Sequence, residues 1–173
     1  MILPAVDSKF DVEGLLGKAR KNLQDRAKPL ITTYRLSLSG NSSSFVKEVG
    51  NLLRKMKLSG ASVDKAMENA VASWKGEDGR IPTQLTSPLS GIAGIGTVHA
   101  QYLQYQTGID DTFQQGLASH SSMYIQGIDK QIEKLKSQND PGAITLFERE
   151  VEKTKQSPKY FADLMLGTDP GSN

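Results

Sequence analysis

The sequence predicts an all-α protein of five to seven helices, with a small two-stranded β-ribbon as an open alternative for two short segments. Hydrophobic residues recur at spacings of three and four over most of the 173 residues. Helix start signals separate these stripes, above all Asp140-Pro141 and Ser157-Pro158. With 37% hydrophobic and 23% charged residues, the composition is that of a globular protein, and the length suits one domain over residues 1–173.

Three hydrophobic stripes predict helices in the first half of the chain. The first extends from Val12 to Leu23, and Pro29 should end or restart it. The second extends from Phe45 to Met56, and Asn41 with the three serines after it offers N-caps. The third consists of Val63, Ala66, Met67, Ala70, Val71 and Trp74. We expect this third stripe to line one buried face, with an N-cap at Ser59 or Ser62 and a left-handed stop at Gly76.

Two segments have a pattern that also fits strands. Apolar residues alternate with more polar ones over residues 30–38, which is typical of a half-buried strand. Residues 79–86 can pair with it, although Pro82 would confine that strand to a sheet edge. The same residues 30–38 can instead continue the first helix after a kink, so both structures remain open.

The second half of the chain is predicted to be helical to its end. After the glycine-rich run 91–96, helical spacing extends over residues 98–109 and again over 113–135, where each internal glycine costs about 1 kcal/mol relative to alanine. Asp140 and Ser157 are the expected N-caps of two further helices, and Gly167 should stop the last one. The polar tail 168–173 should be flexible.

Residues 81–128 carry only two formal charges, those of Asp110 and Asp111, although charged residues are frequent elsewhere. The stretch is rich in glutamine, glycine and tyrosine, residues that give contact area and adaptable hydrogen bonds without charge repulsion. We therefore expect a protein-contact surface within residues 85–128. Its candidate residues are Tyr102, Gln104, Tyr105, Gln114 and Gln115. A 60° offset prevents Tyr102 and Tyr105 from facing one core together, and Gln101 and Gln106 should widen the uncharged surface.

The basic residues are concentrated near the amino terminus. Residues 1–60 contain eleven Lys or Arg against five Asp or Glu, whereas the whole chain has a net charge of +2. A basic face of this kind suits an acidic partner or anionic headgroups, but a solvated helix surface is the favoured interpretation. Acidic residues interrupt the basic ones and aromatic platforms are absent among them, so no nucleic-acid binding is expected.

Catalytic patterns are weak throughout the sequence. Glu77 and Asp78 form a pair of acids on a glycine-flanked loop, which can serve a small hydrolase but is more typical of a solvated turn. His99 and His120 have no ligand-type neighbour three or four residues away on a helix face, so we expect no metal site and no cofactor. The chain contains no cysteine, which excludes disulfides and thiolate chemistry.

The glycine-rich run 91–96 raises the alternative of a membrane-active protein. The uncharged segment around it is too short and too polar for a transmembrane helix, and close helix packing is the favoured interpretation, so membrane contact is not favoured. The amino terminus lacks the features of a Sec signal peptide, which leaves a cytoplasmic protein or export by another route.

These observations together predict a non-enzymatic helical protein that binds a protein partner or assembles with itself. The missing cysteine and the composition rich in Ser, Gln, Asn and Gly are compatible with an exported bacterial virulence effector or a secretion-system subunit. The hydrolase and the membrane-active protein are the alternatives.

Overall fold

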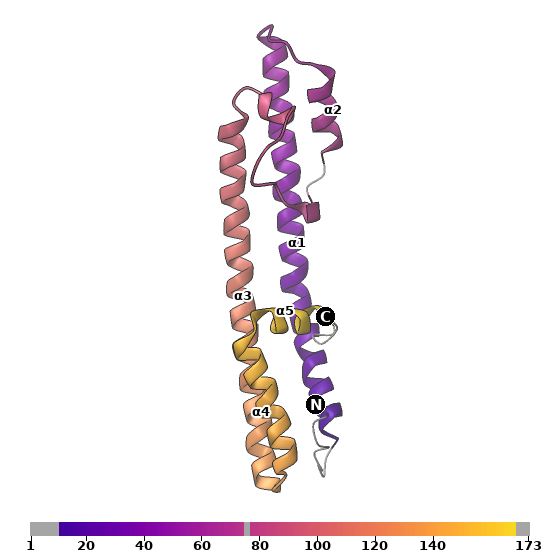
Figure 1. Cartoon of the computed structure of the whole chain (residues 1–173), viewed down its shortest axis with the longest axis vertical. Coiled ribbons are helices and arrows are strands. Elements are labelled where there is room, and N and C mark those ends of the chain that lie inside the picture. Colours follow the sequence, from indigo (N-terminus) through magenta and orange to yellow (C-terminus); the bar gives the residue numbers. More distant parts are fainter. Residues whose placement is uncertain (1–10, 75–76, 169–173) are drawn as a thin grey trace. The chain divides into compact units, whose positions relative to one another are not determined.

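The computed structural model of the chain describes residues 11–74 and 77–168. Within these residues there are five α-helices and no strand, which confirms the all-α prediction and leaves no β-ribbon. As labelled in Figure 1, the helices are α1 (Val12–Leu58), α2 (Lys65–Ser73), α3 (Ile95–Gln138), α4 (Pro141–Gln156) and α5 (Pro158–Leu166). Two 3₁₀ turns, η1 (Glu77–Gly79) and η2 (Leu89–Gly91), lie between α2 and α3. Gly76 and residues 169–173 of the expected tail lie outside the described residues.

The internal contacts divide the chain into two compact units. The first unit comprises Met1–Leu30 with Gln114–Asn173, and the second comprises Ile31–Phe113. Helices α1 and α3 each contribute one part to either unit. A single domain over residues 1–173 stays a prediction.

Helix α1 is much longer than the sequence pattern predicts, and it replaces both the expected helix boundary and the expected strand. Pro29 lies inside α1 and neither ends nor restarts it, and the expected strand 30–38 belongs to the same helix. Leu30, Tyr34 and Leu38 are four residues apart and turn inward to different degrees, whereas Leu36 is 68% exposed. Residues four apart on one helix face also fall on alternate positions of the sequence. A short helical stripe with one exposed leucine therefore produces the same pattern as the alternation of a strand.

The expected N-caps at residues 41–44 are wrong for the same reason, because these residues lie in the middle of α1. A proline inside a helix costs about 3 kcal/mol or more. Packing on both sides of Pro29 offsets that cost, since Leu23 and Ala27 before it and Leu38 after it are buried. Tertiary burial, and not local propensity, therefore decides the length of α1.

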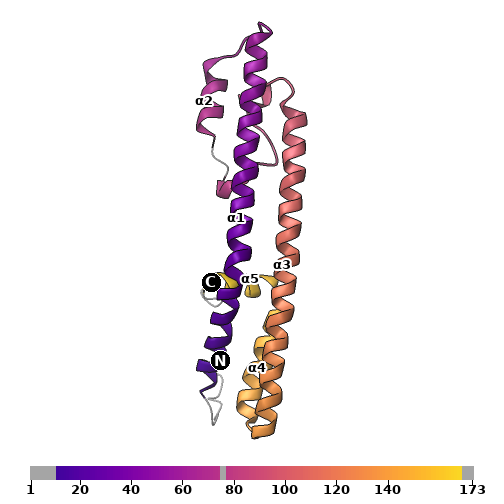
Figure 2. The ribbon, with the colours of Figure 1, turned by 180° about the vertical axis from the view of Figure 1, so that it is seen from behind.

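The second unit is built around an apolar cluster formed by α1, the segment before α3, and the start of α3. Its buried members are Phe45, Val49, Leu53, Ile81, Leu89, Ile92 and Ile95. Helix α2, which lies beside α1 in Figures 1 and 2, covers this cluster with half-buried side chains. The ring of Trp74 lies edge-on to that of Phe45, with centroids 5.5 Å apart. The predicted stripe faces the core but is only half-buried, and its member Ala66 is exposed. Asp64 caps the helix in place of Ser59 or Ser62.

The first unit contains the start of α1, the end of α3, and helices α4 and α5. Figures 1 and 2 show α4 running back along α3 and α5 turning across the bundle. Its buried side chains include Leu16, Leu23, Ala27, Ile128, Ile132, Leu135, Phe147, Val151, Phe161 and Leu164. The local signals here are confirmed: Asp140 and Ser157 cap α4 and α5 with their side chains, and Gly167 ends α5 at a φ of 72°.

Candidate binding surface on helix α3

The candidate surface is centred on two tyrosines one turn apart on α3. The half-buried ring of Tyr102 packs edge-on against Phe45, with ring centroids 5.8 Å apart. Tyr105 lies edge-on to Tyr102 at 5.6 Å and is 51% exposed. The Gln101 side-chain amide donates a 2.8 Å hydrogen bond to the Tyr105 hydroxyl oxygen. Because Tyr102 is fixed on the core and supports Tyr105, the exposed ring is held in a defined orientation.

Two amide side chains fasten this part of α3 to its surroundings. Asn41 on α1 donates a hydrogen bond of 3.1 Å to the backbone carbonyl of Tyr102. The Gln106 side chain accepts a 2.7 Å hydrogen bond from the Ile81 N–H and donates one of 3.2 Å to the Ile81 carbonyl. Gln106 is only 6% exposed, so it belongs to the interior and not to the uncharged surface in which the sequence placed it.

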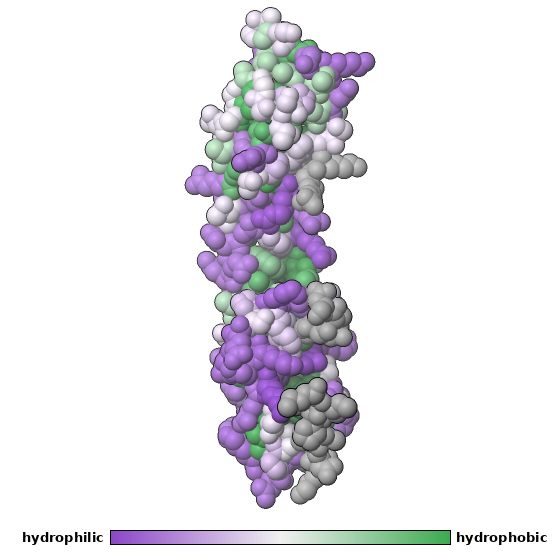
Figure 3. Space-filling model, viewed as in Figure 1, coloured by the Kyte–Doolittle hydropathy of each residue, from purple (hydrophilic) through white to green (hydrophobic). Residues whose placement is uncertain are grey.

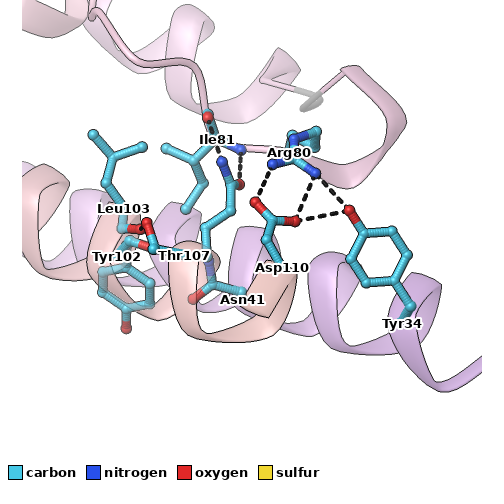
Figure 4. Close-up of polar contacts among 9 residues, drawn as sticks. Tyr34, Asn41, Arg80, Ile81, Tyr102, Leu103, Thr107 and Asp110 are labelled. Atoms are coloured by element: carbon cyan, nitrogen blue, oxygen red, sulfur yellow. Dashed lines mark hydrogen bonds and ion pairs between the residues drawn. The ribbon is translucent and has the colours of Figure 1, made fainter. Parts of the chain in front are cut away.

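A second polar cluster beside it holds Arg80 between α1 and α3. The Arg80 guanidinium donates two hydrogen bonds to the Asp110 carboxylate, of 2.5 and 3.0 Å, and one of 2.7 Å to the Tyr34 hydroxyl. Tyr34 in turn donates to Asp110 at 2.8 Å, and its ring stacks on Phe113 with centroids 4.1 Å apart (Figure 4 shows the hydrogen bonds). The hydrogen bond from Arg80 lowers the pKa of Asp110, while burial raises the pKa of Tyr34.

The ion pair with Arg80 neutralises Asp110, one of the two charged residues of the charge-poor stretch. The exposed positions of α3 in the second unit are Gly96, Thr97, Ala100, Gln101, Gln104, Tyr105, Thr107, Gly108, Asp111 and Thr112. Among these ten positions Asp111 alone is charged. Exposed helix faces of globular proteins usually carry charged residues, so an uncharged face of this extent is unusual. We call these exposed positions the α3 face.

The predicted contact residues are distributed over both units. Gln104 and Tyr105 are exposed on the α3 face, and Tyr102 lies half-buried beneath it. Gln114 and Gln115 are also exposed, but they belong to the first unit. The candidate surface is therefore described by the residues of the second unit.

The two histidines belong to different units and have different surroundings. The His99 Nε2 atom lies 2.7 Å from the carbonyl oxygen of Pro82, so this nitrogen donates a hydrogen bond to the loop before α3. His120 lines a groove in the first unit. Among the described residues, no group of three or more His, Asp or Glu side chains is arranged to hold a metal ion.

The acidic pair considered for a hydrolase shows no catalytic arrangement within the described residues. Asp78 is exposed, and its φ of 52° places it in the left-handed region on the turn η1. The side chain of Glu77 lies outside the described residues. A solvated turn residue is therefore the structural role of Asp78.

The glycine-rich run 91–96 is used for packing. Ile92 and Ile95 are 2% and 5% exposed within the apolar cluster, and Gly94 adopts a φ of 80° at the turn that leads into α3. A side chain at such a φ would be strained, which explains the glycine. No helix within the described part of the chain is long and apolar enough to cross a membrane.

The first unit also contains a buried polar network that no pattern in the sequence indicates. Glu150 on α4, 3% exposed, accepts hydrogen bonds of 3.1 and 2.7 Å from Arg20 on α1. Tyr124 on α3 and Tyr160 on α5 donate further bonds to it, of 2.7 and 2.6 Å. Burial by itself raises the pKa of Glu150, but the hydrogen bonds from Arg20, Tyr160 and Tyr124 outweigh it and leave the pKa below its usual value. Burial and the contact with Glu150 raise the pKa of Tyr160 to about 12.

All four members of this network are partnered, and together they tie four helices into one unit. Among the described residues, no buried side-chain nitrogen or oxygen lacks a hydrogen-bond partner. A network without a free acid, base or nucleophile has the properties of a structural element. No signal at the sequence level links Arg20 with Glu150, because 130 residues separate them.

Comparison with known proteins identifies no relative. No family model, no curated protein sequence and no solved structure matches this chain.

Proposed function

We propose that the chain is a non-enzymatic helical binding protein whose contact surface is the α3 face of the second unit. The observation that carries the proposal is the half-exposed ring of Tyr105, which is held on Tyr102 at the centre of an almost uncharged helix surface. Tyrosine is enriched at protein interfaces, because its ring provides apolar area and its hydroxyl a hydrogen bond.

The composition of the face favours a protein partner. Glutamine and threonine side chains around Tyr105 can pair with backbone or side-chain groups without the desolvation cost of a charge. On the face of the molecule shown in Figure 3, hydrophobic residues reach the surface in separate areas with hydrophilic ones between them. Recognition by an aromatic anchor among polar contacts fits the α3 face, where the exposed Tyr105 lies among glutamine and threonine residues.

The alternatives receive less support. A hydrolase would need an acid and a base together in a cavity. Asp78 is a solvated turn residue and His99 bonds the loop before α3. His120 lines a groove, but no acidic side chain is among the described residues of its lining. A membrane-active run would need exposed apolar side chains, whereas Ile92 and Ile95 are buried in the core. Self-assembly through the α3 face and binding of a different protein remain two forms of the same proposal.

The test is a substitution that adds charge to the face without disturbing the core. Gln104→Lys, together with Tyr105→Ala, should abolish capture of a partner from the native host or reduce self-association in light scattering. A desolvated, unpaired charge at an interface costs several kcal/mol. Gln84→Lys is the matched control, since Gln84 is exposed on the loop outside the α3 face. Unchanged binding by a folded Gln104→Lys/Tyr105→Ala variant would remove the α3 face as the contact.

We further propose that the protein is an exported bacterial effector or secretion-system subunit, and that proposal has only the composition behind it. Its test is the appearance of the tagged chain in the culture medium of the native host, compared with a strain lacking its specialised secretion systems. Equal export from both strains, or none from either, would remove it.

A further inference from the structure

The first unit contains a second feature that the contact surface does not involve. A groove with a volume of about 370 Å³ lies between the start of α1 and the end of α3. Leu15, Leu23 and Ile128 belong to its apolar lining, while Lys18 and Arg26 add positive charge. Volumes of this order are typical of sites for small molecules.

The two helix segments that form the groove run in opposite directions, and one contact fixes their register. A side chain on Gly116 would meet Leu30, so these two positions lie side by side. Counting back along α1 and forward along α3 from this point brings Arg26 level with His120 and Leu15 level with Gln131. Arg26 and His120 therefore lie at one end of the groove, and Leu15 and Gln131 lie at the other. The two ends are eleven residues apart along each helix, or about 16 Å.

The two basic residues that line the groove form no ion pair within the part of the chain that the structure describes. Lys21 and Lys28 pair with Asp25, and Arg20 pairs with Glu150. In contrast, Lys18 and Arg26 are exposed and have no hydrogen bond or ion pair with any described residue. No acidic side chain is among the described residues that line the groove. Two cations without a described partner, at a partly apolar groove whose described lining holds no acid, favour a negatively charged ligand.

The apolar lining of the groove is partly open. Met123, at the groove, is 46% exposed, and a Cβ atom added at Gly127 would meet nothing within 4 Å. Glycine inside a helix is unfavourable, and an open position beside the groove leaves space for a ligand. The groove thus combines apolar side chains in its wall with an exposed cation at one end, Arg26, and a second one, Lys18, nearer the other end.

We propose that this groove binds a medium-chain fatty acid. The carboxylate lies at the Arg26 and His120 end, where a guanidinium pairs with it in two parallel hydrogen bonds. The alkyl chain lies along Leu15, Leu23 and Ile128 past Gly127. A twelve-carbon chain built from bonds of about 1.5 Å reaches roughly the length of the groove when extended. The site is separate from the α3 face and does not depend on the proposed function.

The experiment is calorimetric titration of the full chain with dodecanoate below its micelle concentration. Dodecanoate should bind at one site, and dodecylamine, which has the same tail and the opposite charge, should bind at least about tenfold more weakly. Gly127→Leu fills the groove and should weaken dodecanoate binding by about tenfold or more. Gly108→Leu is the matched control: it is an open, exposed glycine on the same helix but in the second unit, and its variant should bind like the wild type.

A variant that leaves the interior untouched tests the charge. Arg26→Gln changes an exposed side chain without a described partner, and it should weaken dodecanoate binding roughly tenfold while the circular dichroism spectrum stays unchanged. The proposal is overturned if dodecanoate does not bind, if dodecylamine binds equally well, or if Gly127→Leu and Arg26→Gln both bind as the wild type does. Binding of an acidic amphipathic peptide in the absence of dodecanoate binding would also overturn it and would make the groove a peptide site.

Discussion

Replacing Glu150 by glutamine should destabilise the first unit by about 2–3 kcal/mol at neutral pH. The buried carboxylate accepts four hydrogen bonds from Arg20, Tyr124 and Tyr160. A glutamine offers one acceptor oxygen and turns its NH₂ group toward the remaining donors. Breaking one partner of a buried ion pair costs about 3–5 kcal/mol, but the Arg20 side chain is 36% exposed and regains water, so a value below that range applies.

The tyrosine near-ultraviolet circular dichroism that follows urea unfolding contains the signals of Tyr124 and Tyr160 in this network and those of three tyrosines in the second unit. Fluorescence of Trp74 reports the second unit separately. The control is Glu148→Gln, an exposed glutamate on the same helix α4, which should change stability by less than about 0.5 kcal/mol. If Glu150→Gln unfolds within the same 0.5 kcal/mol of the wild type, the network does not hold the four helices together as argued.

The same carboxylate predicts a direction for the pH dependence. The pKa of Glu150 is lower in the folded chain than in the unfolded one, so its ionised form stabilises the folded state. That contribution is complete above the unfolded value, about 4.3, and is lost as the pH falls through the lower folded value. The stability difference between the wild type and Glu150→Gln should therefore shrink on acidification below about pH 4.3. A difference that stays constant down to pH 2 would contradict the lowered pKa.

Four further substitutions have defined outcomes. Gln106→Leu should cost about 1–3 kcal/mol in urea unfolding, because the buried N–H and carbonyl of Ile81 lose their partner. Trp74→Ala should cost about 3 kcal/mol, the lower end for a large-to-small change since the ring is half-buried, and native Trp74 emission should be blue-shifted from that of free tryptophan. Gly108→Ala should stabilise the chain by about 0.5–1 kcal/mol in thermal melting, whereas Gly116→Ala should not, because its Cβ would lie 2.6 Å from a methyl of Leu30.

Each of these outcomes has a result that contradicts it. Gln104→Leu is the control for Gln106→Leu, because Gln104 is exposed two residues away; equal losses in the two variants would show that the Ile81 contact is unimportant. An emission maximum of Trp74 at the position of free tryptophan would contradict its packing on Phe45. Equal gains at Gly108 and Gly116 would show that Leu30 moves aside freely.

Local signals predicted the carboxyl-terminal helices well because each of those signals acts within one turn. Asp140 and Ser157 accept hydrogen bonds from backbone N–H groups three residues ahead, and Gly167 adopts a φ of 72° where a helix must stop. These interactions do not depend on the rest of the fold. Sequence spacing therefore suffices to find them.

Helix α1 shows where such reasoning fails. Pro29 and Asn41 are local stop and start signals, yet both lie within one helix. Asn41 uses its side chain to bond the Tyr102 carbonyl across the unit, and a capping role is thereby replaced by a tertiary one. The energy that decides such cases comes from contacts between residues distant in sequence, which spacing does not reveal.

The same limit applies to the candidate surface. The sequence identifies the lack of charge in residues 81–128, but charge content does not say which glutamines face solvent. Gln104 is exposed and Gln106 is buried, two residues apart, because a helix turns about 200° between them. Asp110 and Asp111 are divided in the same way, one bound to Arg80 and the other exposed. The phase of α3 relative to its core therefore decides which residues a partner can reach. That phase is set by the packing of Ile95 and Tyr102 and by the two hydrogen bonds between the Gln106 side chain and the Ile81 backbone. Removing these hydrogen bonds, as in Gln106→Leu, should therefore also weaken partner binding through the α3 face.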